Sequence, residues 1–189
     1  MTPPGGARIV VVSGPAGVGK TTVCQRLVAT GKVDLIVSAT TRPPRGQERD
    51  GLHYHFLTPA EFARRRDAGE FLEWAVVHGR HCYGTPKQAV KDVLAAGRHA
   101  LLNIDVQGAK QLREQGHALL TVFLLPPTLD VLRQRMVGRG DTEPAEIERR
   151  LETARVEIAA AEQLYDVCIK NIDLDQVVGS ILANLDEAR

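Results

Sequence analysis

The chain has 189 residues, with 24 Lys and Arg against 23 Asp and Glu, so its formal net charge is +1. This length fits one domain with a substantial core, and the balanced charge argues against a surface for nucleic acid. Three cysteines, an odd number without a C-x-x-C pair, favour a reducing compartment over a disulfide framework. No uninterrupted apolar segment is long enough to span a membrane, so we expect a cytoplasmic protein.

The first predicted elements frame a glycine-rich turn. An apolar run without alternation predicts a buried strand of a parallel sheet over residues 8–13, and a helix is predicted over 21–29. The turn between them reads Gly14-Pro15-Ala16-Gly17-Val18-Gly19-Lys20-Thr21. It matches the phosphate-binding pattern G-x-x-x-x-G-K-[ST], and the strand before it and the helix after it are the context that supports the match.

Each residue type in this motif has a physical reason. Glycines let the backbone curl so that successive N–H groups point at a phosphate, and the helix N-terminus adds a partial positive charge. Lys20 can reach the outer phosphates, and the Thr21 hydroxyl can ligate the accompanying Mg²⁺. A turn without a ligand would explain the glycines but not the lysine–threonine pair. We therefore predict that the chain binds a nucleoside triphosphate with Mg²⁺.

The segment from about 38 to 84 is polar and carries short elements. An apolar run at 35–37 is followed by a predicted strand at 53–57. A capping box at 58 then begins a predicted helix that runs to about 68. A strand is predicted at 71–77, and a further helix is predicted to begin at Thr85-Pro86 and to end at Gly97. This segment is best explained as an insertion that builds a second, smaller lobe.

From His99 onward, buried strands alternate with helices again. The predicted elements are strands at 99–106, 118–125 and 167–170, and helices at 107–115, from 128, at 144–165 and at 174–185. Strands linked by helices predict an α/β fold, with a parallel sheet flanked by helices and right-handed crossovers. The basic, glycine-containing stretch Arg135–Thr142 is a candidate mobile lid.

Arginines help to choose among the classes that a phosphate loop leaves open: GTP-switch protein, transport ATPase, helicase and small-molecule kinase. They occur on three separate elements: Arg42 and Arg45 in the insertion, Arg135 and Arg139 in the lid, and Arg149 and Arg150 on the following helix. Such a set favours phosphoryl transfer, in which charge is clamped on both sides of the transferred group. Taken singly, each arginine is better explained as a solvated surface residue, and only the group with its Gly/Pro setting favours the functional explanation.

Several further motifs occur in order and at fixed spacing. They are Ser38-x-x-Thr41-Arg42-x-Pro44-Arg45, Gly51-x-x-Tyr54-x-Phe56, Glu70-Phe71-x-Glu73-Trp74-Ala75, Tyr83-Gly84-Thr85, Ile104-Asp105-x-Gln107-Gly108 and Arg135-x-x-x-Arg139-Gly140. On these motifs the chain resembles guanylate kinases over nearly its whole length, from Ile9 to Leu185. The resemblance implies a reaction of purine metabolism in which ATP and GMP (and dGMP) give ADP and GDP (and dGDP), with Mg²⁺.

The resemblance also implies an architecture. It is a P-loop NTPase fold in one guanylate-kinase-like domain over 1–189, with an inserted small α/β lobe that binds GMP and with a lid. The implied parts are a core at about 8–37, 86–134 and 156–189, a GMP-binding lobe at 38–85 and a lid at 135–155. The sequence carries no signal of oligomeric state.

Residue roles follow position by position from the same resemblance. The implied ligands of the GMP phosphate are Arg42, Arg45, Tyr54 and Tyr83, and those of guanine are Ser38, Glu73, Thr85 and Asp105. On the ATP side the implied residues are the loop Gly14–Thr21, the lid arginines Arg135 and Arg139, and Asn171 near the adenine. The implied catalytic residues are Lys20, Arg42, Arg135, Arg139 and Arg150, with Thr21 as the Mg²⁺ ligand.

Elementary chemistry independently selects Glu73 for base recognition. Guanine presents N1–H and N2–H₂ as two adjacent donors, which a carboxylate accepts as a pair, whereas adenine has an acceptor at N1. Thr85 would then donate to O6. The alternative is that Glu73 is an outward-facing strand residue.

One departure from the family pattern concerns Asn103, because the family usually has a carboxylate two residues before Asp105. It brings no charge to the metal side of the site. Asn103 is also the only hint of a rival function, a scaffolding module that has lost catalysis, although such modules typically degrade the phosphate loop. A kinase of another nucleoside monophosphate is a second rival. A GTP switch is disfavoured because no Asn-Lys-x-Asp motif occurs.

Overall fold

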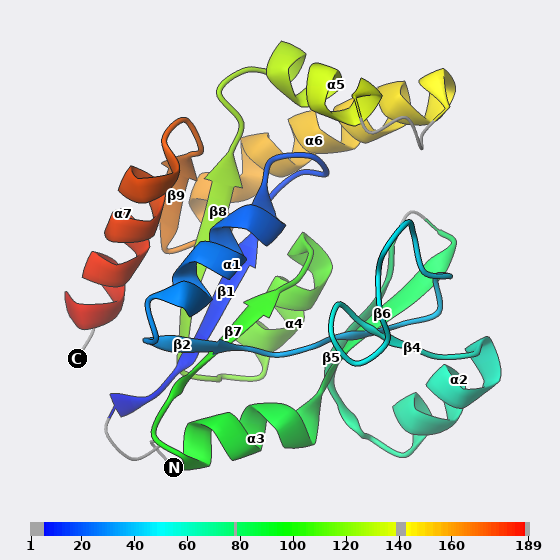
Figure 1. The fold of residues 1–189 in the computed structure, drawn as a ribbon, viewed down its shortest axis with the longest axis vertical. Coiled ribbons are helices and arrows are strands. Elements are labelled where there is room, and N and C mark those ends of the chain that lie inside the picture. Colours follow the sequence, from blue (N-terminus) through cyan, green and yellow to red (C-terminus); the bar gives the residue numbers. More distant parts are fainter. Residues whose placement is uncertain (1–5, 78, 139–142, 188–189) are drawn as a thin grey trace.

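The structure, a computed structural model, describes residues 6–77, 79–138 and 143–187 (Figure 1). The described elements are, in chain order, β1 Ile9–Ser13, α1 Lys20–Ala29, β2 Val33–Leu35, β3 Ala39–Thr40, β4 His55–Phe56, α2 Pro59–Asp67, β5 Phe71–Val77, β6 His81–Pro86, α3 Lys87–Ala95, β7 His99–Asn103, α4 Val106–Glu114, β8 Leu119–Leu125, α5 Leu129–Val137, α6 Pro144–Leu164, β9 Val167–Lys170 and α7 Leu174–Glu187.

The main sheet has five parallel strands in the order β2-β7-β1-β8-β9. Strand β1 lies at its centre, where Val10 is in register with Leu101 on one side and Leu120 on the other. Non-consecutive neighbours require helical crossovers, and helices cover both faces of this sheet (Figure 1). The predicted α/β fold with a parallel sheet flanked by helices is confirmed.

The two faces of β1 pack into two separate hydrophobic clusters. Val10 and Val12 belong to the cluster that includes side chains of α1, α5 and α7. Ile9 and Val11 belong to the other cluster, with side chains of α3, α4 and the end of α6. Because both faces are covered, every residue of β1 is buried. This explains why the run is apolar without alternation.

A second sheet, with the order β4-β3-β6-β5, lies within residues 39–86 and beside the main sheet (Figure 1). Its strands pair in mixed fashion, antiparallel between β5 and β6 and between β6 and β3, and parallel between β3 and β4. It has a small core of its own, in which the rings of Phe62 and Phe71 stack with centroids 4.6 Å apart. We call this sheet with α2 the small lobe.

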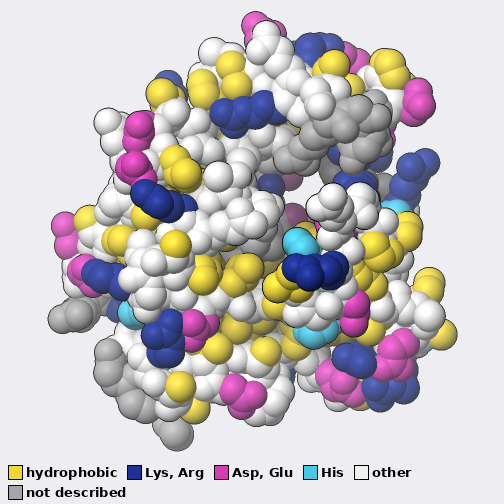
Figure 2. Space-filling view, in the orientation of Figure 1, with side chains coloured by type: hydrophobic (Ala, Val, Ile, Leu, Met, Phe, Trp, Pro, Cys, Tyr) yellow, Lys and Arg dark blue, Asp and Glu magenta, His cyan; other side chains and the backbone are white. Residues whose placement is uncertain are grey.

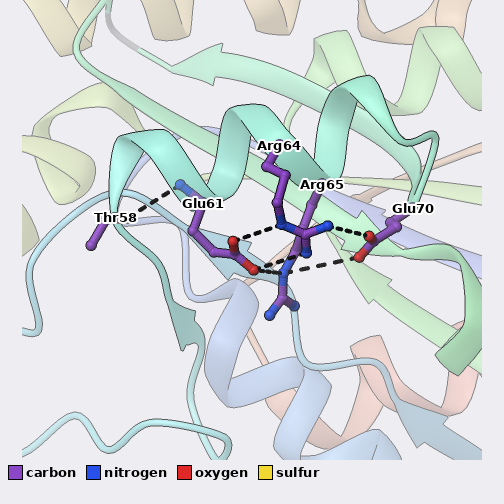
Figure 3. A network of polar contacts seen from close by, with 5 residues as sticks. All are labelled: Thr58, Glu61, Arg64, Arg65 and Glu70. Carbon is purple, nitrogen blue, oxygen red and sulfur yellow. Dashed lines mark hydrogen bonds and ion pairs between the residues drawn. The ribbon is translucent and has the colours of Figure 1, made fainter.

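Helix α2 covers the small lobe and is held by local polar contacts (Figure 3). Thr58 caps it, because its hydroxyl accepts a hydrogen bond from the Glu61 N–H at 3.2 Å, as the predicted capping box requires. The Glu61 carboxylate accepts from Arg64 at 2.9 Å and from Arg65 at 2.7 Å, and Arg64 also reaches Glu70 at 3.2 Å. These hydrogen bonds hold the pKa of Glu61 at about 2.

Two local predictions are wrong. Residues 85–86 belong to β6, and helix α3 begins only at Lys87 without a side-chain cap. The reason is that Thr85 pairs with Glu73 across the antiparallel strands, so neither its backbone nor its hydroxyl is available for capping. The strand predicted over 53–57 is shorter, since β4 contains only His55–Phe56, and Tyr54 makes an isolated bridge to Asp50.

Strands β2, β3 and β6 were not predicted, because they are short or polar and form only through pairing with distant strands. The remaining elements follow the predicted ones within a few residues. The longest helix, α6, spans Pro144–Leu164, and Thr128 caps α5 through the Val131 N–H at 3.2 Å. Arg139 and the rest of 139–142, part of the predicted lid, lie outside the described residues. Among the residues that the structure describes, no helix has the length and apolar character to cross a membrane.

Truncation of a core side chain on β7 tests how far the main sheet determines stability. Leu101 is fully buried, so Leu101→Ala should lower the free energy of unfolding by about 2 to 5 kcal/mol, through lost transfer energy and a residual cavity. Leu52→Ala is the control, because Leu52 is 52% exposed, and it should change stability by less than about 0.5 kcal/mol. Urea unfolding of both variants measures this, and equal losses would contradict the packing described.

Candidate active site

The turn between β1 and α1 adopts a backbone that only glycine permits at two of its positions. Gly14 has a φ of +145°, and an added Cβ would lie 2.6 Å from the backbone oxygen of Leu124 on β8. Gly19 has a φ of +107°, and an added Cβ would lie 2.7 Å from the Asn171 amide nitrogen. The loop is therefore pressed against the carboxyl ends of β8 and β9. Its glycines are required by close approach as well as by backbone conformation.

Lys20 is the first residue of α1 and folds back over the loop. Its Nζ donates hydrogen bonds to the carbonyl oxygens of Gly14 at 2.5 Å and Pro15 at 3.1 Å. The helix has Gly19 at its N-cap and therefore no side-chain cap, so its first N–H groups remain available to an anion. Thr21, the proposed metal ligand, is exposed on the same turn.

The carbonyl of Val18 in this loop is held by two long side chains from distant elements. Arg135, in the last turn of α5, donates to it at 3.0 Å, and the Asn171 side chain donates to it at 2.8 Å. Both residues thus lie beside the phosphate loop and fix its shape. Neither lines the main cleft.

A cleft of about 560 Å³ lies in front of the loop, bounded by the small lobe and α6. It is visible as a hollow in the space-filling view (Figure 2). The predicted site residues that line it are Gly14, Ala16, Lys20, Ser38, Arg45, Tyr54, Glu73, Tyr83, Asp105 and Arg150. Those described but outside its lining are Pro15, Gly17, Val18, Gly19, Thr21, Arg42, Thr85, Arg135 and Asn171. The structure therefore brings four separate parts of the chain to one cavity: the phosphate loop, the small lobe, the loop after β7, and α6.

Glu73, on β5, is a buried carboxylate at the wall of this cleft. It is 4% exposed, and the Thr85 hydroxyl donates a hydrogen bond to it at 2.6 Å. Burial raises the pKa of Glu73 to about 7, and the charge of Asp105 acts in the same direction. A side chain at Gly108 would collide with the carboxylate, so glycine there leaves it room. The alternative of an outward-facing strand residue is wrong.

Asp105 has a structural task that its predicted role did not include. It is the N-cap of α4, and its carboxylate accepts a hydrogen bond from the Gly108 N–H at 2.9 Å. Such a cap fixes the loop that follows β7 and holds the side chain at the cleft wall. Thr85, predicted to meet the base, lies behind Glu73 and is completely buried.

Arg42 is buried inside the small lobe. Its guanidinium donates to the Tyr83 hydroxyl at 3.1 Å, to the Pro43 carbonyl at 2.7 Å and to the Glu48 carboxylate at 2.9 Å. It also lies 5.4 Å from the centroid of the Tyr54 ring. Arg42 therefore organises the two tyrosines in this conformation. Its partner Glu48 was missed from the sequence, since nothing in its turn-rich segment marks it as a salt-bridge partner.

A smaller pocket of about 70 Å³ adjoins this group, between the small lobe and α6. Its lining is strongly basic and consists of Arg42, Arg45, Val77, Arg80, His81, Tyr83, Glu146 and Arg150. Arg45 and Arg150 line both cavities. The basic side chains of the small lobe and of α6 thus converge on one region, as expected for groups that clamp phosphate.

Helix α6 presents a polar stripe to the cleft, made of Arg149, Arg150, Thr153 and Glu157. These positions recur every three or four residues, so they share one helix face. The carboxylate of Glu146 accepts from Arg150 at 2.9 Å and pairs with Arg149 at 2.7 Å. Thr153 and Glu157 were missed from the sequence, although helical spacing from the two arginines would have found them.

The family model for guanylate kinase matches residues 6–188. The chain belongs to the guanylate kinase family.

Individual relatives agree with this membership. The chain is 47% identical to the guanylate kinase of Thermobifida fusca over 93% of its own length and 89% of that protein. It is 48% identical to the guanylate kinase of Bifidobacterium longum, over 92% of its own length and 91% of that protein. The crystal structure of guanylate kinase from Anaplasma phagocytophilum is 31% identical, covers 99% of this chain and 88% of that one, and superposes with a TM-score of 0.79. The P-loop NTPase fold expected from the motifs is confirmed.

The raised pKa of Glu73 predicts a pH-dependent stability. The folded-state pKa of about 7 lies above the unfolded value of 4.5, so the folded protein binds the extra proton more tightly. That contribution is complete below pH 4.5 and is lost as the pH rises through 7. Glu73→Gln keeps the size and accepts from Thr85 but cannot ionise. The variant should gain up to about 3 kcal/mol over the parent between pH 5 and pH 8.

Urea unfolding of both proteins at pH 5 and pH 8 measures this gain. Glu162→Gln is the matched control, because Glu162 is exposed on α6 and makes the same change in charge. The control should show no such pH trend. A difference between Glu73→Gln and the parent that stays equal at both pH values would contradict the assigned burial effect.

Proposed function

We propose that this chain transfers the γ-phosphoryl group of ATP to GMP, giving ADP and GDP, in purine nucleotide metabolism. We propose that dGMP is accepted as well. The observation that carries the proposal is the buried Glu73 carboxylate, which faces the same cleft as the phosphate loop. The wall with Glu73 can therefore bind a base that presents two adjacent hydrogen-bond donors, while the wall with the phosphate loop can bind a triphosphate.

Base recognition is assigned to Glu73 together with Ser38, Asp105 and Thr85. A carboxylate accepts both N1–H and N2–H₂ of guanine, and the 2.6 Å hydrogen bond from Thr85 fixes its orientation. A site of this kind leaves its buried carboxylate unpaired against AMP, which is a polar mismatch of the sort that rejects a substrate by roughly 10⁴. Thr85 can donate to guanine O6 only by giving up this contact.

The GMP phosphate is assigned to Arg45, Tyr54 and Tyr83, with Arg42 as a fourth ligand. The first three line the main cleft, and Arg42 bonds the hydroxyl of Tyr83. Arginine guanidiniums and phenol hydroxyls are strong donors for a phosphate dianion. A direct contact from Arg42 requires a rearrangement of its contact with Glu48.

The triphosphate of ATP is assigned to the loop from Gly14 to Thr21, with Lys20 on the outer phosphates. The arginines proposed to neutralise the triphosphate are Arg150, Arg135 and Arg139. Asn171 is proposed to lie near the adenine. We propose the core, GMP-binding lobe and lid with the boundaries given above. Closure of the lobe 38–85 and the lid 135–155 onto the core would exclude water from the transfer.

Catalysis in this scheme needs no general base. The attacking oxygen of the GMP phosphate is already anionic, so the residues act by positioning the reactants in line and by neutralising charge. Lys20 and the arginines carry this neutralisation. Mg²⁺ bound with ATP would supply further charge at the phosphates, and Thr21 offers it a hard oxygen ligand.

The surroundings of the reaction are also proposed. All three cysteines of the chain are free thiols in the structure, which supports a reducing, cytoplasmic location. The substrates are small anions, and the near-neutral net charge of +1 supports the absence of a nucleic-acid partner.

A panel of nucleoside monophosphates tests the function. In a coupled assay of ADP release, GMP and dGMP should turn over while AMP, CMP and UMP are poor substrates. Glu73→Gln should lower kcat/KM for GMP by at least about 10²-fold and leave that for AMP nearly unchanged, since only the guanine contact is lost. A folded parent protein without GMP turnover would favour a binding module. Unchanged base preference in the variant would refute the role of Glu73.

Arg45 provides a test of the acceptor phosphate site. Arg45→Gln should raise the KM for GMP about tenfold or more, because a charged hydrogen bond to phosphate is removed, and leave the KM for ATP unchanged. Arg49→Gln is the matched control, since Arg49 is exposed on the same segment and does not line the cleft. Steady-state kinetics with each substrate varied separately distinguishes the two sites. Equal effects of both variants would argue against the assignment.

A further inference from the structure

Three carboxylates line the main cleft among the described residues, and two of them have hydrogen-bond partners. Glu73 accepts from Thr85 at 2.6 Å, and Asp105 accepts from Gly108 at 2.9 Å. The third, Glu157 on α6, accepts no hydrogen bond from any residue that the structure describes. A partly buried acid that faces a cavity without a hydrogen-bond partner has oxygens available to a ligand in the cavity.

Glu157 lines the same cleft as Lys20 of the phosphate loop and Asp105, which follows the end of β7. Burial raises the pKa of Glu157, the positive charge of Lys20 lowers it, and the negative charge of Asp105 raises it. This is the phosphate side of the cleft, where Asn103 contributes an uncharged amide.

A carboxylate here would repel the phosphates of both nucleotides unless a cation lies between them. Lys20, Arg149 and Arg150 line the same cleft and supply part of this positive charge. A divalent cation that arrives with the nucleotide is a further source. The Glu157 carboxylate and the hydroxyl of Thr21, which lies on the phosphate loop outside the cleft lining, are hard oxygen ligands that suit Mg²⁺.

The described residues offer no preformed cage for such an ion. Within 6–77, 79–138 and 143–187, no group of three or more His, Cys, Asp or Glu side chains is placed to hold a metal. That is the usual situation for Mg²⁺ in nucleotide sites, where one or two carboxylates complement the phosphate oxygens and water. A single carboxylate with free oxygens is therefore what such a site requires from the protein.

We propose that Glu157 is the carboxylate that receives, directly or through water, the divalent cation accompanying ATP. The inference rests on the proposed kinase function, and it assigns α6 a role in metal binding besides its arginines. In this proposal Glu157 supplies the negative charge that the uncharged Asn103, at the end of β7, does not supply.

The test measures nucleotide binding against free metal concentration. Binding of a non-hydrolysable ATP analogue is followed by calorimetry at increasing free Mg²⁺, and Mn²⁺ replaces Mg²⁺ for electron paramagnetic resonance of the bound ion. Glu157→Gln should shift the metal midpoint upward by about tenfold or more. Nucleotide affinity in EDTA should stay equal or rise, because a negative charge has been removed.

Glu162→Gln is the control, since it makes the same change at an exposed position of the same helix and should leave the midpoint unchanged. Asn103→Asp in the Glu157→Gln background returns one carboxylate to this side of the cleft. It should recover a large part of the lost metal affinity. Recovery would support the proposal, and a folded double variant with no recovery would overturn it.

Two further outcomes would overturn the proposal. One is an unchanged metal midpoint in Glu157→Gln. The other is an equal loss of nucleotide affinity with Mg²⁺ and with EDTA, which would indicate a purely structural role. The test needs only binding, so it is independent of the GMP assay. Failure of GMP turnover in the parent protein would concern the proposed function alone.

Discussion

The shape of the phosphate loop depends on one backbone carbonyl, that of Val18. Arg135 and Asn171 reach it from α5 and from the end of β9, and together they satisfy its acceptor capacity. The loop also has an internal hydrogen bond, from the Val18 N–H to the Pro15 carbonyl at 3.2 Å. The two contacts to the Val18 carbonyl tie the loop to α5 and to the residue that follows β9.

The small lobe, in contrast, depends on a buried charge. Arg42 and Glu48 form an ion pair whose side chains are 6% and 24% exposed. Breaking a pair of this kind leaves an uncompensated charge and costs more than the pair gains when formed. The arginine is therefore well suited to hold Tyr83 in place. Arg45, exposed at the cleft, is the more accessible cation for an incoming phosphate.

Sequence patterns predicted the parts of the structure that depend on local chemistry. The buried strands were evident from apolar runs, the loop from its motif, and α2 from the capping box at Thr58. The contacts that complete the site depend instead on distant partners. Arg135 lies 117 residues from the Val18 carbonyl, and Thr85 was assigned to a helix start because its pairing with Glu73 is a tertiary contact. Such contacts override local propensity.

The same limit explains why Glu157 was missed. Helical spacing places Glu157 on the face of Arg149 and Arg150, but only the packing of α6 shows that this face borders the cleft, unlike the position of the exposed Glu162. The buried residues of α6, among them Ile147, Leu151 and Ala154, form one face of the helix, and the cleft lies against another face. Helical spacing from Arg149 and Arg150 defines that second face.

Local charge in the cleft differs from the charge of the whole chain. The described lining includes Lys20, Arg45, Arg149 and Arg150 against three carboxylates, and the pKa of one of these, Glu73, lies at about 7. The cavity is thus positive in a chain whose net charge is only +1. A compact positive cavity attracts small polyanions, whereas a chain with balanced charge has little overall attraction for an extended polyanion. The placement of these charges supports the proposed preference for nucleotides over nucleic acid.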